Sequence, residues 1–455
     1  MRSSTSGPNR RALLAWAAGA GLALPARGLV WPRLPPLAPR QRRLANGLSL
    51  LALPMEDSAS VAVQLWYRVG GKDDPPGRSG FAHLFEHMMF KGTRHMAAEQ
   101  FDRLTEDVGG SNNAFTAEDM TVYHSVVPAH HLEPLLWAEA ERMANLNVDQ
   151  AAFDSERAVV KEEYRQRVLA DPYGRLFNAI PVYGYQQHAY QRPVIGHIEE
   201  LDAATLTDLR AFHAGFYRPD NAVLIVAGAF DPGQLEAWVE HYFGSIPLPR
   251  APVPRRESRE PRRTRDELHR LTAPGVPQPA ALAIWQGPRA DAEEVPALQL
   301  AQALLAQGDA ARLNEALVNE RPLAQSVGFE LMLNAEAGLL AAHAIAAGTT
   351  RPEALLAALT REIHRVAEEP LATAELDKAK AQLLTQALVE RETPEGRALA
   401  LGNALLLRGD ALAAERDLVR LQAVGAEELQ RALRRHVLQG ARVALLYGPG
   451  EGAAR

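Results

Sequence analysis

Cysteine is absent from this chain of 455 residues. Its absence excludes disulfides, thiolate metal ligands, a cysteine nucleophile and a lipid-modified cysteine anchor, so a metal site would have to use histidine and carboxylate ligands. A strong charge of one sign is also lacking: 49 basic and 55 acidic residues give a net charge of −6, which gives no reason to expect nucleic acid as a partner. Past residue 26, no apolar run is long enough to span a membrane.

The segment Phe81–Phe90 places two histidines four residues apart with a carboxylate between them. Helix formers dominate it and it contains no Pro or Gly, which predicts a helix. Positions i and i+4 lie on one face of a helix, so His83 and His87 can bind one ion, and Glu86 can address a water on that ion. This is the inverted zincin order, His-x-x-Glu-His, and it predicts zinc-assisted hydrolysis. The alternative is an amphipathic helix whose histidines are only hydrogen-bonded.

A third metal ligand is expected from a second helix, predicted over residues 150–168. Glu156 and Glu163 are seven residues apart and share one face of that helix, whereas Glu162 points about 100° away. The geometry favours Glu163 as the ligand and Glu156 as a supporting residue that orients a ligand or the water. Alternatively, all three carboxylates are solvent-facing charges paired with neighbouring basic residues.

An internal duplication divides the chain. Asn221–Gly228 has a counterpart in Ala441–Gly448, 220 positions on, and Leu65-Trp66 has one in Ile284-Trp285, 219 positions on. These repeats predict two homologous α/β domains. Where the histidine-bearing helix should recur, Gln299–Leu305 contains no His or Glu. One domain is therefore expected to carry the chemistry.

The predicted boundaries follow from composition. Residues 44–247 form the zinc-binding domain and residues 267–455 the homologous, non-catalytic domain. Between them, residues 248–266 are rich in Pro and Arg, which predicts a solvated linker. A basic docking patch is the alternative for that segment.

The N-terminus has the features of an export signal. Arg10-Arg11 precede an apolar run from Ala12 to Leu24, which is too short to cross a bilayer and is followed by Pro25-Ala26. Residues 1–26 are therefore predicted to be a signal, possibly of the twin-arginine type, and residues 27–43 an N-terminal arm. An exported protein, in a bacterial periplasm, is expected. A basic extension on a cytoplasmic enzyme is the alternative.

A segment between the two predicted helices is suited to peptide binding. The glycines of Gly109–Thr116 end the preceding helix at Val108, and Ala114 to Tyr123 can extend as an edge strand. An unpaired strand edge can accept a peptide through backbone hydrogen bonds, with Asn113, Ala114 and Phe115 as the expected clamps. The alternative is an ordinary strand protected by the other domain.

Over nearly its whole mature length, the chain resembles the pitrilysin family of inverted zincins, which includes insulin-degrading enzyme and the mitochondrial processing peptidase. The resemblance implies an α+β fold of two mainly antiparallel sheets covered by helices, in a clam-shell-like assembly. It also implies one Zn²⁺ per chain, Glu163 as the third ligand, Glu86 as general base, and the strand at Asn113 as substrate site. The segments that carry it are Gly80–Thr93, Gly109–Thr116, Glu156–Glu163, Arg192–Gly196 and Phe216–Asn221.

The chain departs from that family in the second domain. Self-sufficient members carry an Arg, and a Tyr seven residues later, that reach the substrate; Val318 and Gln325 stand at the matching positions here. We therefore expect a zinc endopeptidase that depends on a homologous non-zinc subunit in a heterodimer, or that forms a homodimer. The alternative is a non-catalytic assembly subunit, which the intact His83, Glu86, His87 and Glu163 disfavour.

Overall fold

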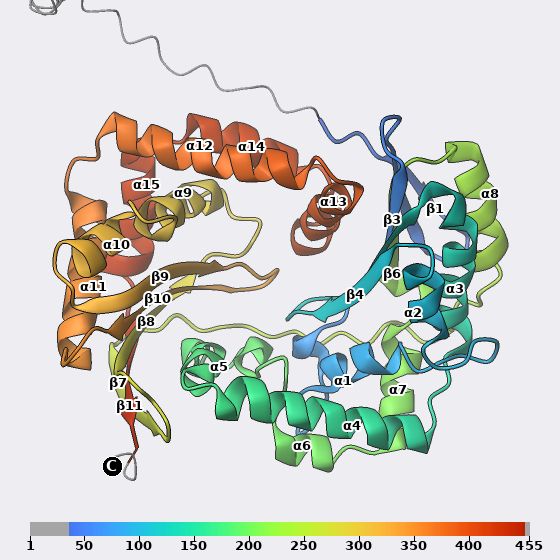
Figure 1. The fold of residues 1–455 in the computed structure, drawn as a ribbon, viewed down its shortest axis with the longest axis horizontal. Coiled ribbons are helices and arrows are strands. Elements are labelled where there is room, and N and C mark those ends of the chain that lie inside the picture. Colours follow the sequence, from blue (N-terminus) through green and yellow to red (C-terminus); the bar gives the residue numbers. More distant parts are fainter. Residues whose placement is uncertain (1–35, 451–455) are drawn as a thin grey trace, which may run out of the picture. The chain divides into compact units, whose positions relative to one another are not determined.

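The computed structural model describes residues 36–450. The predicted export signal over residues 1–26 and the first part of the predicted arm lie outside the described residues. Within residues 36–450, no helix combines the length and the apolar character that a membrane crossing requires. These residues fold around two β-sheets, each covered by helices (Figure 1).

The first sheet has six strands in the order β1-β2-β6-β3-β5-β4. Their bounds are β1 Arg40–Arg43, β2 Ser49–Pro54, β3 Ser60–Tyr67, β4 Ser111–Thr116, β5 Thr121–Pro128 and β6 Ala222–Gly228. Only β2 and β6 pair in parallel; the other neighbours are antiparallel. Arg40–Arg43 lies within the predicted N-terminal arm, residues 27–43, but it pairs with β2 and so forms one edge of this sheet.

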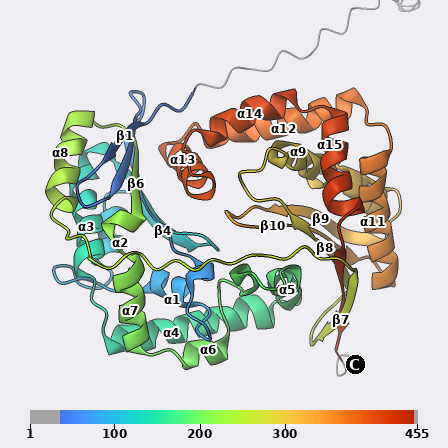
Figure 2. The same cartoon turned by 180° about the vertical axis from the view of Figure 1, so that it is seen from behind.

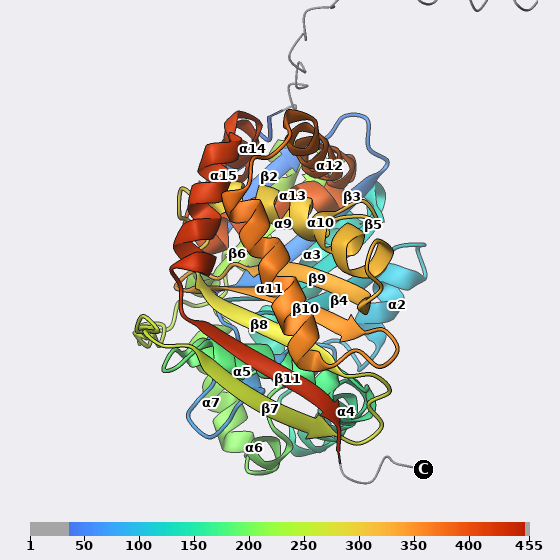
Figure 3. The same cartoon turned by 90° about the vertical axis from the view of Figure 1, so that its left-hand side faces the viewer.

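The second sheet repeats this topology in the order β7-β11-β8-β10-β9 (Figure 3). Its strands are β7 Glu267–Ala273, β8 Ala280–Gly287, β9 Ala324–Met332, β10 Gly338–Ala346 and β11 Arg442–Pro449. β11 lies between a parallel β7 and an antiparallel β8, as β6 lies between β2 and β3. The sequence repeats fall on equivalent strands, which confirms the α+β fold with two homologous, mainly antiparallel sheets.

The helices also follow the duplication. The first half contains α1 Phe81–Met88, α2 Gln100–Glu106, α3 Leu132–Asn145, α4 Gln150–Tyr164, α5 Gly174–Gly184, α6 Ile198–Asp202, α7 Leu206–Phe216 and α8 Pro232–Phe243. The second half contains α9 Val295–Ala306, α10 Arg312–Asn314, α11 Pro352–Glu368, α12 Thr373–Glu390, α13 Pro394–Arg408, α14 Ala413–Ala423 and α15 Ala426–Leu433. Short 3₁₀ turns (η1 Gly71–Asp73, η2 Ala129–His131, η4 Ala189–Gln191, η5 Pro219–Asn221) and π-helical turns (η3 Arg165–Ala170, η6 Glu315–Asn319, η7 Arg434–Leu438) complete the described secondary structure.

The two halves exchange one helix each. Leu176 and Ile180 of α5, from the first half, belong to the apolar core built on the second sheet. In return, Ala398 and Leu401 of α13, from the second half, pack in a core with Trp66 of β3 on the first sheet (Figure 1). Each sheet is thus covered in part by the other half, so the halves depend on each other for burial of apolar surface.

The segment between the halves, residues 248–266, is mostly exposed, but some of its side chains also bind the folded halves (Figure 2). The carboxylate of Glu260 accepts a hydrogen bond from the backbone N–H of His188 at 3.0 Å. Arg263 is only 6% exposed and pairs with Glu267 at 2.5 Å. Arg255 also donates to the backbone oxygen of Arg68 at 2.8 Å, so the segment is tied to the folded halves at a few side chains.

Two glycines of the exchanged helices give a test of this packing. A Cβ at Gly402 of α13 would lie 2.2 Å from ring carbons of Trp66, whereas one at Gly184 of α5 would meet first the flexible end of Leu339, at 2.5 Å. Because the Trp66 ring is buried and rigid, Gly402→Ala should destabilise the chain by about 1–3 kcal/mol. Gly184→Ala, the matched control, should change stability by less, since Leu339 can rotate away. Thermal melting of both variants checks this; equal melting temperatures for both would contradict the packing.

Candidate metal centre

The helix that carries the two histidines begins at a buried cap. Gly80 precedes α1 with φ 86°, and Asp74 accepts hydrogen bonds from the backbone N–H groups of Gly80 at 2.7 Å and Ala82 at 2.8 Å. Complete burial raises the pKa of Asp74 to about 7, although these hydrogen bonds oppose the shift. Asp74 lies seven residues before the first residue of α1, in the loop after η1, so that loop sets the position of α1.

The structure brings His83, His87 and Glu163 together. Oε2 of Glu163 lies 3.7 Å from Nε2 of His83 and 3.5 Å from Nε2 of His87. Ligand atoms bound to one tetrahedral Zn²⁺ at about 2.1 Å are separated by about 3.4 Å. The three donors therefore fit a zinc ion, and within residues 36–450 they form the one cluster with such spacing.

Glu156 and Glu162 point in different directions from α4. Oε2 of Glu156 lies 3.4 Å from Nδ1 of His87, and its Oε1 is 2.8 Å from Nζ of Lys91. Such a carboxylate behind a histidine fixes the orientation of its ring. Glu162 is exposed and pairs with Arg165 at 3.2 Å.

The two imidazoles differ in their proton affinity. Burial, aided by the neighbouring His87, lowers the pKa of His83 to about 4. Burial acts in the same direction on His87, but its hydrogen bonds to Glu156 and Glu163 outweigh it and raise the pKa of His87 to about 9. Nδ1 of His83 is buried and has no hydrogen-bond partner among the described residues. Of the two histidines, His87 is therefore the one whose Nδ1 faces a carboxylate, that of Glu156.

Glu86 lies beside the three donors and is held from the neighbouring strand. The hydroxyl of Thr116, the last residue of β4, donates to Oε2 of Glu86 at 2.5 Å. Burial raises the pKa of Glu86, and this hydrogen bond opposes the shift. This role of Thr116 is not predicted from the sequence, because the residues around Thr116 do not indicate that β4 runs beside α1.

A cavity of about 720 Å³ joins these groups to the edge of the first sheet. Asn113, Ala114 and Phe115 line it from β4, the outermost strand. The expected strand from Ala114 to Tyr123 is wrong: β4 ends at Thr116, and β5 begins at Thr121. The intervening turn, closed by a hydrogen bond from Ala117 N to Met120 O at 2.8 Å, lacks the Gly or Pro that would have predicted it.

A second residue missed from the sequence is Arg167, in η3 just after α4. Its guanidinium lies 2.6 Å from Oε1 of Glu163 and its side chain is 74% exposed. It lines the same cavity. One oxygen of Glu163 thus faces Arg167 while the other faces both histidines, which orients the carboxylate toward the donor cluster.

The part of the second half that the structure describes, residues 267–450, contains no equivalent donor cluster. α9 occupies in the second half the place that α1 has in the first, with Gln299 and Gln302 along it. Val318 lies in η6 and Gln325 is exposed in β9, the outermost strand of its sheet. Neither side chain is an Arg or a Tyr, so this half presents neither residue at the positions where the resemblance calls for them.

Comparison with known proteins agrees with this division. The family model for Insulinase (Peptidase family M16) matches residues 51–197, and that for the Peptidase M16 inactive domain matches residues 203–383. The zinc protease PqqE of Helicobacter pylori is 30% identical over 342 residues, covering 74% of this chain and 76% of that protein. An uncharacterized zinc protease of Mycobacterium tuberculosis, Rv2782c, is 31% identical over 424 residues, covering 91% of this chain and 94% of that protein.

One more distant relative and two solved structures are also named as peptidases or proteases. The mitochondrial-processing peptidase subunit beta of Saccharomyces cerevisiae is 26% identical over 223 residues, covering 49% of this chain and 48% of that protein. The crystal structure of a protease from Helicobacter pylori superposes with a TM-score of 0.88 at 25% identity, covering 90% of this chain and 99% of that one. The periplasmic protease PqqL from Escherichia coli superposes with a TM-score of 0.74 at 19% identity, covering 91% of this chain and 48% of that one. From the matched models and the identity to these relatives, the chain belongs to peptidase family M16.

Proposed function

We propose that this protein is a zinc-dependent endopeptidase that hydrolyses extended peptides or unstructured segments, with one Zn²⁺ held by His83, His87 and Glu163. The observation that carries the proposal is their spacing, 3.5 and 3.7 Å between donor atoms, in a cavity that also contains Glu86 and a free strand edge. Relatives named zinc proteases support the choice of metal.

The protein's own groups have distinct tasks in this mechanism. When bound, Zn²⁺ supplies the Lewis acidity that makes water a nucleophile at neutral pH and polarises a carbonyl. Glu86 takes the proton of the attacking water and gives it to the leaving amine nitrogen, first as a base and then as an acid. Its raised pKa suits both roles, and the Thr116 hydroxyl holds one carboxylate oxygen so that the other can face the water.

The substrate is proposed to bind along β4. An added strand would lie along Asn113, Ala114 and Phe115 at the outer edge of the first sheet, bound through those backbone groups that point away from β5 and independently of the peptide's side chains. In the structure the N–H of Ala114 donates to the side-chain oxygen of Asn113 at 2.8 Å. A bound peptide would replace this hydrogen bond with one to its own backbone carbonyl. This mode selects extended chains, since a folded domain cannot offer a strand to the cavity.

The ligand assignment is tested by three glutamate variants of α4. Glu163→Ala removes a proposed ligand and should abolish stoichiometric zinc binding. Glu156→Gln should weaken zinc binding by about 10–100-fold, because it disturbs the carboxylate that orients His87. Glu162→Gln is the matched control and should bind zinc normally, since Glu162 is exposed and faces away. Zinc content after dialysis, with competition titrations, decides between them; retained stoichiometric zinc in Glu163→Ala would show the assignment to be wrong.

The missing Arg and Tyr favour a two-chain enzyme. We propose that a homologous non-zinc subunit supplies them in a heterodimer, with a homodimer as the alternative arrangement. Val318 and Gln325, and the match of the second half to a model described as an inactive domain, support this dependence. The same observations leave a second candidate function, an assembly subunit that keeps the fold without activity.

One assay separates these functions. The isolated chain is given an internally quenched peptide, its zinc content is measured, and Glu86→Gln serves as the control. Glu86→Gln should retain zinc and lose at least about two orders of magnitude in turnover, because it removes the base and not a ligand. Zinc-bound protein without cleavage would require the companion subunit, whereas a chain with neither zinc nor cleavage would favour the assembly role.

We also propose that the protein is exported to a bacterial periplasm. The paired arginines and apolar run in residues 1–26 support it, as does the periplasmic location named for the structurally similar PqqL. Expression of the full chain in a bacterium should yield a periplasmic protein whose N-terminus lies near residue 27. Recovery of an uncleaved chain from the cytoplasm alone would argue against export.

A further inference from the structure

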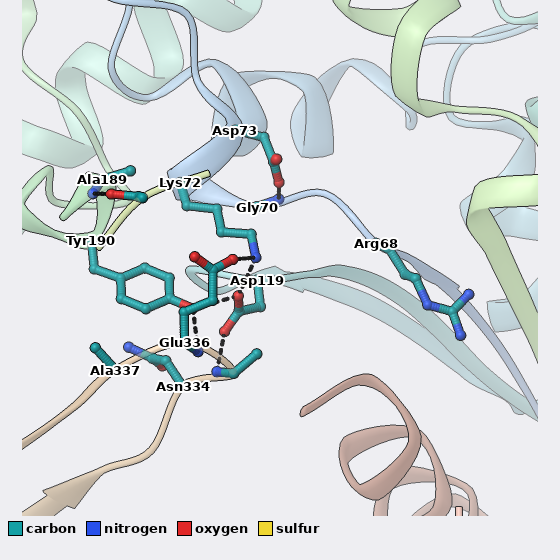
Figure 4. A network of polar contacts seen from close by, with 12 residues as sticks. Arg68, Gly70, Lys72, Asp73, Asp119, Ala189, Tyr190, Asn334, Glu336 and Ala337 are labelled. Atoms are coloured by element: carbon teal, nitrogen blue, oxygen red, sulfur yellow. Dashed lines mark hydrogen bonds and ion pairs between the residues drawn. The ribbon is translucent and has the colours of Figure 1, made fainter. Parts of the chain in front are cut away.

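A polar network joins the second half to the loop that precedes α1 (Figure 4). Nζ of Lys72, in η1, lies 2.7 Å from Oδ1 of Asp119 and 2.6 Å from Oε1 of Glu336. Asp119 belongs to the turn between β4 and β5, and Glu336 to the turn between β9 and β10. Three turns from distant parts of the sequence thus meet at one ammonium group.

The network is partly buried, with the side chains of Lys72 and Glu336 19% and 32% exposed, and its hydrogen-bonding groups are matched. Tyr190 donates its hydroxyl hydrogen to Oδ1 of Asp119 at 2.6 Å, and the backbone N–H of Ala335 donates to Oδ2 at 2.9 Å. The N–H of Glu336 in turn donates to the Tyr190 hydroxyl oxygen at 3.2 Å. The side chains of Asp119 and His188 are 4% and 1% exposed. Because buried charges need full pairing, loss of one member leaves the others uncompensated.

Glu336 supplies the charged side chain that the second half adds to the backbone N–H of Ala335, and it is fixed on both oxygens. Its Oε2 lies 3.1 Å from Nε2 of His188. Nδ1 of that ring accepts the backbone N–H of Tyr190 at 3.2 Å, so Nε2 carries the hydrogen and donates. The hydrogen bond to His188 and the pairing with Lys72 lower the pKa of Glu336 to about 2. Glu336 therefore stays ionised at the pH values where a peptidase would work.

The loop held by Lys72 leads directly to the metal-binding helix. Asp74, two residues after Lys72, is the cap of α1. Arg192 fixes the same loop from another side, donating to the carbonyl oxygens of Lys72 at 2.8 Å and Asp74 at 2.7 Å. A shift of Lys72 would move the carboxylate of Asp74, and with it the N-terminus of α1 and the ring of His83 in its first turn.

We propose that Glu336 is a positioning residue for the metal centre: by fixing Lys72, the metal-free half sets the loop that caps α1. The catalytic part of this inference rests on the proposed function, whereas its effect on metal binding does not. A tetrahedral site accepts donor displacements of only about 0.2 Å, so a small movement of α1 relative to Glu163 weakens binding. A carboxylate that hydrogen-bonds a metal ligand directly changes metal affinity by about 10–100-fold. Glu336 acts through Lys72 and its loop, so we expect an effect at the lower end of that range.

The experiment compares Glu336→Gln and Lys72→Met with a matched control, Glu353→Gln. Glu353 pairs with Arg270 at 2.6 Å within the second half, so its variant removes an ion pair that does not involve the loop. The zinc dissociation constant is measured on the full chain by competition with a chelator. Both network variants should raise this constant about tenfold, and the control should leave it unchanged.

Turnover adds a second readout. At saturating zinc, Glu336→Gln should lower kcat by about tenfold and change KM by less than about twofold, because β4 keeps its pairing with β5 while Glu86 moves with α1. A merely structural role would lower the melting temperature without this division between kcat and KM. The Lys72→Met/Glu336→Gln double variant should be no weaker in zinc binding than Lys72→Met alone, since both act through one path.

Two results would overturn the inference. One is an unchanged zinc dissociation constant in a folded Glu336→Gln chain. The other is additive losses in the double variant, which would mean that Lys72 and Glu336 act separately. If the wild-type chain binds zinc and cleaves no peptide by itself, turnover has to be measured with the companion subunit, while the zinc measurements on the single chain still test the role of Glu336. If Lys72→Met fails to fold, Glu336→Asp, which keeps the charge and shortens the side chain, replaces it with the same expected rise in the zinc constant.

Discussion

The packing of α1 against α4 is the contact on which the candidate site depends. A metal ion needs donors from both helices within tenths of an ångström, and side chains alone cannot give that accuracy. Leu84 and Phe85 of α1 share one apolar core with Phe153 and Val160 of α4. Close packing of that core fixes the spacing of the helices, so the half-buried faces of the same helices can present histidine and glutamate at the required distance.

The second half stabilises this arrangement without adding ligands to it. Its α13 covers Trp66 on the face of the first sheet opposite the core that contains α1, and its Glu336 pairs with Lys72 in the loop before α1. A duplicated domain that has no donors can therefore remain necessary. It contributes burial of apolar surface and the position of one loop.

Local patterns in the sequence predicted those features that depend on residues close together. The spacing of His83 and His87 and the shared face of Glu156 and Glu163 follow from helix periodicity, and the duplication follows from self-similarity. The contact between Lys72 and Glu336 spans 264 positions, and a loop residue offers no period from which its partner can be derived. The exchange of α5 and α13 was missed for the same reason, since an amphipathic helix does not specify which sheet it covers.

The strand that ends at Thr116 links substrate position to proton transfer. Side chains alternate along a strand, so Ala114 and Thr116 face the same side; Ala114 packs against the core that includes α1, and Thr116 reaches Glu86. A peptide paired with the outer edge of β4 would take its register from the strand that also orients the base. β4 would then position both the scissile bond and Glu86. A shift of the peptide by one residue along β4 would turn every substrate side chain to the opposite face.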